Sequence, residues 1–210
     1  GKAEDFGPWV DKFHRINPDR PLCISEYGVE GIVQYHSAEP KVKDYTEEYH
    51  ALYHEIAWKI FEKKPFLWAT YVWNMFDFGA NIRDEGGVKG RNNKGLVTYD
   101  RRIKKDAFYM YKAHWSDDKF VHITSKRFVD RAESTIQVKA YSNCSEVTLY
   151  VNGEKLRSIS GDEKIFVFEN VPLAEGVNVI RAEATEADNG AIYQDTARFT
   201  KVEQPNAGYE

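Results

Sequence analysis

The chain has 210 residues and a formal net charge of -4, with 30% charged and 14% aromatic residues. This near balance of charge favours neither nucleic acid nor an anionic membrane surface as a partner. Two cysteines, Cys23 and Cys144, exclude a disulfide framework, and no stretch reaches the roughly 18 consecutive apolar residues of a membrane span.

The first half of the chain begins with a helical pattern followed by a strand pattern. Apolar residues between positions 5 and 17 recur every three or four residues, which predicts an amphipathic helix closed by Asn17-Pro18. Residues 22–24 then form a short apolar run that leads to Glu26. This predicts a buried strand with a carboxylate at its carboxyl-terminal tip.

A second helix and a second strand repeat this order. Asp44 stands three residues before Glu47, a capping pattern that predicts a helix from there toward Pro65. Residues 66–74 are rich in aromatic and β-branched side chains, so we expect a strand buried on both faces. The glycine-rich segment 79–91 predicts turns and no regular element, and residues 104–115 predict a last helix. Alternating helices and strands are typical of a parallel α/β fold.

The pattern changes after residues 116–118. Short alternating runs at 135–140 and 146–151, with turn signals such as Asn152-Gly153, predict the hairpins of a β-sandwich. We therefore expect two domains, residues 1–117 and 118–210.

A glutamate at the end of a strand more often caps a helix or pairs with an arginine, so its role is decided by other motifs. Three runs occur in order: Ser-Glu-Tyr-Gly at 25–28, Trp-Asn-Met-Phe-Asp-Phe at 73–78, and Asn-Asn-Lys-Gly-Leu-Val-Thr-Tyr-Asp-Arg at 92–101, which is followed by Lys-Lys-Asp-Ala-Phe-Tyr at 104–109. Together they resemble the last part of glycoside hydrolase family 2 enzymes, the β-galactosidase and β-glucuronidase group. The resemblance implies α/β plus all-β architecture: the C-terminal part of a (β/α)₈ TIM barrel followed by an immunoglobulin-like β-sandwich.

The resemblance also implies roles for four residues. Glu26 is the expected catalytic nucleophile, and Trp73 is the expected apolar floor under the sugar. Asn92 and Lys94 match an Asn-x-Lys pair that binds the sugar-acid carboxylate in β-glucuronidases, although a structural or general sugar-contact role stays open for Lys94. Family members often carry a cis peptide bond after this tryptophan, here at Trp73-Asn74. A core position is the alternative for Trp73 and is the preferred prediction for Trp68.

A retaining glycosidase needs two carboxylates about 5–5.5 Å apart, a nucleophile and an acid/base. No Asn-Glu dipeptide precedes Glu26, so we expect a C-terminal piece that lacks the acid/base and is inactive alone. The activity expected of the whole enzyme is that of a β-galactosidase, acting on terminal β-galactosides through a covalent glycosyl intermediate. A β-glucuronidase is the alternative. No cofactor and no metal are expected.

The expected partners are a β-linked carbohydrate and a second copy of the chain. Self-association is expected through the barrel half, because two strands without barrel neighbours leave unpaired edges. A third hypothesis is a non-catalytic carbohydrate-binding or spacer module. It relies on Tyr141, Tyr150 and Tyr193 of the predicted sandwich.

Overall fold

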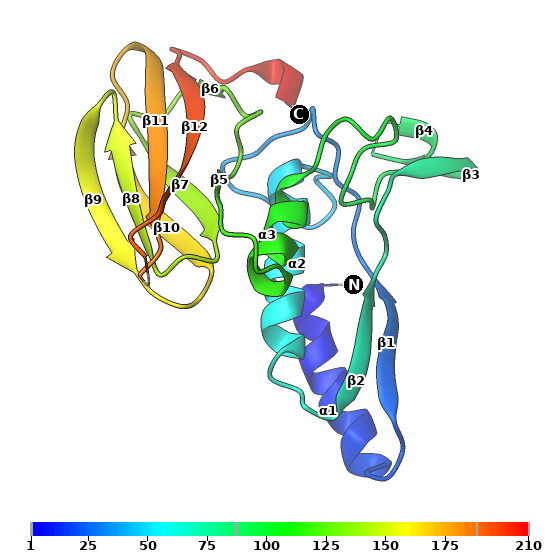
Figure 1. The fold of residues 1–210 in the computed structure, drawn as a ribbon. Coiled ribbons are helices and arrows are strands. Elements are labelled where there is room, and N and C mark those ends of the chain that lie inside the picture. Colours follow the sequence, from blue (N-terminus) through cyan, green and yellow to red (C-terminus); the bar gives the residue numbers. More distant parts are fainter. Residues whose placement is uncertain (1, 87, 188, 210) are drawn as a thin grey trace. The chain divides into compact units, whose positions relative to one another are not determined.

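The computed structural model describes residues 2–86, 88–187 and 189–209. It is mostly β-structure with few helices and divides into two compact units, residues 1–108 and 109–210 (Figure 1). Helix α3 (Asp106–Trp115) runs across this division, so the predicted boundary after residue 117 stays a prediction. Within the described ranges, no helix is both long enough and apolar enough to cross a bilayer.

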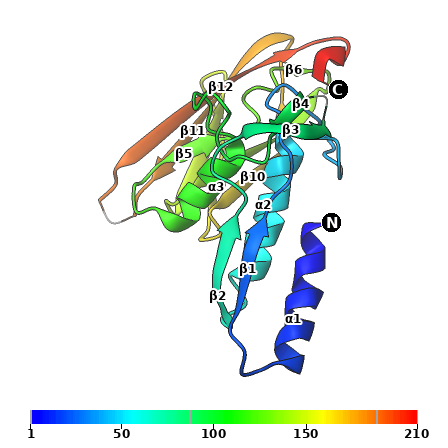
Figure 2. The same cartoon turned by 90° about the vertical axis from the view of Figure 1, so that its right-hand side faces the viewer.

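Two helices and a two-stranded parallel sheet form the main part of the first unit. In chain order the elements are η1 (Ala3–Asp5), α1 (Phe6–Ile16), β1 (Leu22–Tyr27), α2 (Glu47–Phe61) and β2 (Leu67–Val72). Strands β1 and β2 pair in parallel and lie beside the two helices (Figure 2). The predicted order of helix, strand, helix and strand is therefore confirmed.

The N-cap residue of α2 lies two residues after the predicted capping residue, Asp44. Thr46 is the N-cap residue, and its Oγ1 accepts the Tyr49 N–H at 3.0 Å. The Asp44 carboxylate instead accepts the backbone N–H and the hydroxyl of Thr46, each at 2.9 Å. Asp44 thus holds the capping residue in place, and the helix begins at Glu47.

The prediction that the second strand is buried on both faces is wrong. Trp68 is 62% exposed and Tyr71 is 51% exposed, so the predicted core position of Trp68 is also wrong. In the described part of the chain the β1–β2 sheet has two strands, and α2 packs against the ring of Tyr27 on β1. The exposed rings of β2 fit the expected self-association of this half, which stays a prediction.

Residues 78–92 form a hairpin where the glycine pattern predicts turns alone. Strands β3 (Phe78–Glu85) and β4 (Val88–Asn92) are antiparallel, with Phe78 opposite Asn92 and Glu85 opposite Val88. Gly86 has φ +63°, a left-handed conformation that glycine adopts without steric cost. Gly86 therefore lies at the turn of the hairpin, whereas Gly79 and Gly90 lie within its strands.

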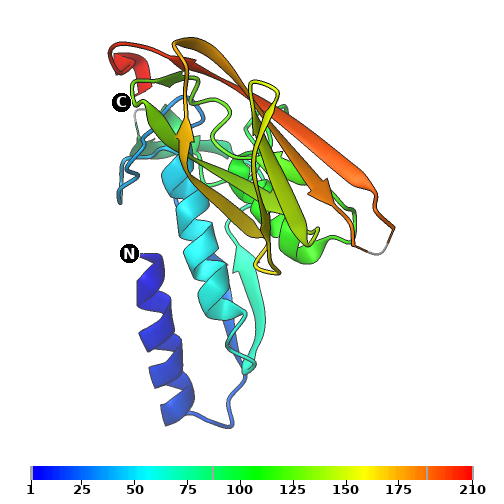
Figure 3. The same cartoon turned by 90° about the vertical axis from the view of Figure 1, so that its left-hand side faces the viewer.

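Two sheets build the second unit (Figure 1; Figure 3). One has the strand order β10-β7-β5 and the other β6-β12-β11-β8-β9, and β6 is parallel to its neighbour β12. The strands are β5 (Val121–Ile123), β6 (Asp130–Arg131), β7 (Thr135–Ser142), β8 (Glu146–Val151), β9 (Glu154–Ser160), β10 (Ile165–Pro172), β11 (Gly176–Thr185) and β12 (Ile192–Lys201), followed by η2 (Ala207–Tyr209). The predicted strands are confirmed, whereas the immunoglobulin-like topology stays a prediction.

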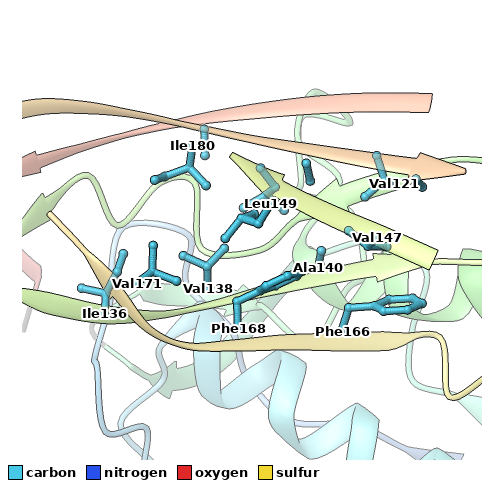
Figure 4. Packing of buried hydrophobic residues seen from close by; sticks show 14 of the residues in the cluster. Val121, Ile136, Val138, Ala140, Val147, Leu149, Phe166, Phe168, Val171 and Ile180 are labelled. Atoms are coloured by element: carbon cyan, nitrogen blue, oxygen red, sulfur yellow. The ribbon is translucent and has the colours of Figure 1, made fainter. Parts of the chain in front are cut away.

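The core of the second unit lies between the two sheets (Figure 4). Alternate residues of each strand point inward, as the period of two in an extended chain requires. Val138 and Phe168 from one sheet belong to the same buried cluster as Leu149 and Ile180 from the other.

The tyrosines of the binding-module hypothesis are poorly placed for a flat polysaccharide. Tyr141 is fully buried, so its ring is closed to a ligand. The Arg181 guanidinium lies 4.0 Å from the centre of the Tyr150 ring and covers one of its faces. Tyr193 is half-buried. This hypothesis therefore loses its main support.

Phe168→Ala tests the core of the second unit. The ring is fully buried, so its removal leaves a cavity and lowers the free energy of unfolding by about 3–5 kcal/mol. Val177→Ala on the exposed end of β11 is the control and changes it by less than about 0.5 kcal/mol. Chemical denaturation measures both variants, and equal losses would contradict this description of the core.

Candidate functional site

A pocket of about 400 Å³ lies in the first unit, where β1 and β2 end. The four residues singled out from the sequence, Glu26, Trp73, Asn92 and Lys94, all line it. The remaining lining residues are Phe6, Tyr27, Gly28, Tyr53 and Arg83. The structure thus brings together side chains from three separate motifs.

An irregularity in β1 turns Glu26 out of the core. Ile24 pairs with Thr70 and Tyr27 pairs with Val72, so three steps along β1 match two steps along β2. One extra residue in a strand re-aims the side chains that follow it. Tyr27 is therefore buried, and Glu26 is exposed to the pocket. Within the described residues, the Glu26 carboxylate has no hydrogen bond or ion pair.

Gly28 allows the end of β1 to meet the residue that follows β2. A Cβ at Gly28 would lie 2.0 Å from the Trp73 carbonyl oxygen, so no larger residue fits without a shift of the backbone. The Trp73 N–H donates to the Tyr27 carbonyl at 2.8 Å. The peptide bond between Trp73 and Asn74 is cis, which confirms the prediction. Trp73 is 40% exposed, so its indole is not a core side chain.

The Asn92–Lys94 loop is shaped by its own side chain. The Asn92 Oδ1 accepts the Lys94 N–H at 3.1 Å, which is a turn stabilised by an asparagine. The amide nitrogen of Asn92 therefore remains as the polar group that can donate to a ligand. Lys94 is half-buried at the pocket wall.

A buried lysine that the sequence did not reveal holds this loop from behind. The Lys105 Nζ donates to the Asp77 Oδ1 and to the Asn93 carbonyl, each at 2.8 Å, and Asp77 also accepts the Gly95 N–H at 2.8 Å. Burial lowers the pKa of Lys105 and raises the pKa of Asp77, while their mutual attraction opposes both changes. A lysine at the start of a predicted helix is usually exposed, so no feature of the sequence indicated that Lys105 is buried.

Glu30 is a second buried anchor for the same loop. Its Oε2 accepts the Asn93 N–H at 2.6 Å, and its Oε1 lies 3.5 Å from a guanidinium nitrogen of Arg83. Burial raises the pKa of Glu30, against the influence of the Asn93 N–H and Arg83.

Tyr53 and Arg83 are among the pocket residues missed in the sequence, because their patterns suggested other roles. Tyr53 belongs to the apolar face of α2, and Arg83 lies in the segment predicted to contain turns alone. Burial raises the pKa of the Tyr53 hydroxyl to about 12.

The pocket offers one carboxylate, one accessible indole and two cations. Glu26 is the one acidic residue among the described residues that line it. A carboxylate can attack an anomeric carbon, an indole can stack on a pyranose, and lysine or arginine can bind an anionic group. No group of three or more His, Cys, Asp or Glu side chains in the described ranges is arranged to hold a metal ion.

The chain is similar to proteins named β-glucuronidase or β-galactosidase. A β-glucuronidase of Bacteroides fragilis is 39% identical over 181 residues, which are 82% of this chain and 26% of that protein. The crystal structure of an FMN-binding β-glucuronidase from Facaelibacterium prausnitzii shares 52% identity at a TM-score of 0.92, over 100% of this chain and 31% of that one. The crystal structure of a putative β-galactosidase from Bacteroides fragilis shares 34% identity at a TM-score of 0.87, over 96% of this chain and 31% of that one.

Residues 133–192 match a family described as a domain of unknown function, DUF4982. The chain spans about a third or less of the length of the relatives named above.

Lys105→Met tests the buried anchor of the loop. The variant leaves the Asp77 carboxylate buried without its cation, so the free energy of unfolding falls by about 3–5 kcal/mol. Adding Asp77→Asn restores part of the loss, because position 77 then no longer carries a buried charge that lacks its cation. Lys104→Met is the matched control: this lysine is exposed and contacts the Phe108 ring, so the loss stays below about 1 kcal/mol. If the Lys105→Met variant were as stable as the Lys104→Met variant, the Lys105–Asp77 contact would not be needed for the stability of the fold.

Proposed function

We propose, from this similarity to glycoside hydrolase family 2 enzymes, that the chain is part of a retaining β-glucuronidase with Glu26 as nucleophile. The relatives support a hydrolase of the glycosidase type in a family 2-like group. The observation that carries the proposal is the single pocket lined by Glu26, Trp73, Asn92 and Lys94.

The comparisons favour the alternative drawn from the sequence, a β-glucuronidase, over its main prediction, a β-galactosidase. The 39% identical curated relative and the 52% identical structure both carry the name β-glucuronidase. The charges in the pocket agree with this choice. A glucuronide carries a carboxylate where a galactoside carries a hydroxyl group, and Lys94 with Arg83 supplies positive charge beside Glu26.

In the proposed reaction, Glu26 attacks the anomeric carbon and forms a glycosyl ester as the bond to the leaving oxygen breaks. A second carboxylic acid protonates that oxygen, then removes a proton from the water that hydrolyses the ester. The described pocket residues contain no second acid, so we propose that another segment of a longer protein supplies it. The Trp73 indole supports the apolar face of the pyranose, while Asn92 and Lys94 hold its carboxylate.

Glu26→Gln in the full-length protein tests the nucleophile. An amide cannot attack the anomeric carbon, so kcat on an aryl β-glucuronide falls by at least about 10³-fold. When the unmodified protein is treated with a 2-fluoro glucuronyl fluoride, mass spectrometry should find the label on the peptide that contains Glu26. The control Ser25→Ala, at an exposed neighbouring position outside the pocket lining, keeps turnover and labelling. Labelling of another residue would rule out this role.

Lys94→Met tests the choice of sugar. Loss of a charge-assisted hydrogen bond lowers kcat/KM for an aryl β-glucuronide by about 10- to 150-fold. The kcat/KM for the matching β-galactoside should change by no more than a few-fold, because that sugar has no carboxylate that Lys94 could contact. An equal loss on both substrates would mean that Lys94 only supports the loop.

A further inference from the structure

Arg83 places a second cation in the pocket. It lies on β3, in the hairpin that the sequence did not predict, and lines the same cavity as Glu26, Trp73 and Lys94. We propose that Arg83 binds the sugar-acid carboxylate together with Lys94, and that it is a specificity-determining residue of the reaction. This inference rests on the proposed function of the pocket.

The guanidinium of Arg83 has donors to spare for a ligand. Its terminal nitrogens lie 3.5 Å from Glu30 and 3.4 Å from Glu85, longer than the roughly 2.7–2.9 Å of a good charge-assisted hydrogen bond. Its Nε is buried, so the terminal nitrogens are the donors that a ligand can reach. The side chain is nevertheless only 24% exposed, so it is held at the pocket wall and does not extend into solvent.

Glu30 is the positioning residue for this cation. It is 5% exposed, and one of its oxygens faces Arg83 while the other accepts the Asn93 N–H at 2.6 Å. Asn93 stands between Asn92 and Lys94, so a single carboxylate orients both the guanidinium and the loop that carries the lysine. The two cations are thereby fixed relative to each other by one buried group.

The two cations differ in the way they recognise an anion. A guanidinium is a planar fork that can donate two parallel hydrogen bonds to a carboxylate, whereas an ammonium acts as a point charge. A neutral sugar offers a hydroxyl group at this position, which adds no negative charge to the long contacts of Arg83 with Glu30 and Glu85 and leaves Lys94 without an ion-pair partner among the described residues. The pair therefore discriminates against neutral sugars more strongly than Lys94 alone.

The test compares an aryl β-glucuronide with its glucuronamide, in which a neutral amide replaces the carboxylate. In the full-length protein, Arg83→Gln should raise KM for the glucuronide by about 10- to 100-fold. KM for the glucuronamide should change by no more than about 2-fold. Arg83→Lys keeps a charge beside Glu30 but loses the planar fork, so its effect is intermediate; it also serves if Arg83→Gln does not fold. Glu30→Gln should raise KM for the glucuronide by a smaller factor and should again leave KM for the glucuronamide nearly unchanged. Arg102→Gln, on a highly exposed side chain, is the control and should match the unmodified protein.

The outcomes separate this inference from the proposed function. If the unmodified protein cleaves the galactoside but not the glucuronide, the proposed function is overturned and this inference with it. If it cleaves the glucuronide and both Arg83 variants leave KM unchanged, or affect glucuronide and glucuronamide equally, the role of Arg83 alone is overturned.

Discussion

The buried contact between Lys105 and Asp77 is the constraint on which the pocket depends. It joins the residue before α3 to the segment after Trp73, and the same lysine holds the carbonyl of Asn93. An ion pair removed from water is costly to break, since either partner left alone is an uncompensated buried charge. The loop that presents Lys94 is therefore fixed from inside the unit, and its outer side remains available to a ligand.

The strand ends show how backbone geometry places chemistry. The extra residue in β1 gives Tyr27 to the core and Glu26 to the pocket, and the missing side chain of Gly28 lets the carbonyl of Trp73 come close. Neither feature adds a functional group. Each determines where an existing group points, which is why a carboxylate and an indole from separate strands line one cavity.

The charges of the pocket are organised in the same way. Glu26 is exposed and has no partner in the described part of the chain, whereas Glu30 is buried and committed to Asn93 and Arg83. Burial accordingly raises the pKa of Glu30, a direction expected of a carboxylate removed from water. The two glutamates lie close in sequence, but their surroundings give them different tasks: one faces the ligand, and the other holds the residues that face it.

The sequence by itself determined helices α1, α2 and α3, strands β1, β2, β7 and β8, and the chemical candidates. Periods of three to four residues or of two can be read within a short window, and the motifs around Glu26, Trp73, Asn92 and Lys94 are local as well. The tertiary structure alone decided that these four side chains share a pocket, that Trp68 is exposed, and which groups support the site. Lys105 and Asp77 are 28 positions apart, and Glu30 and Asn93 are 63 apart. Contacts at such separations depend on how the elements pack, and no local pattern of residue types encodes them.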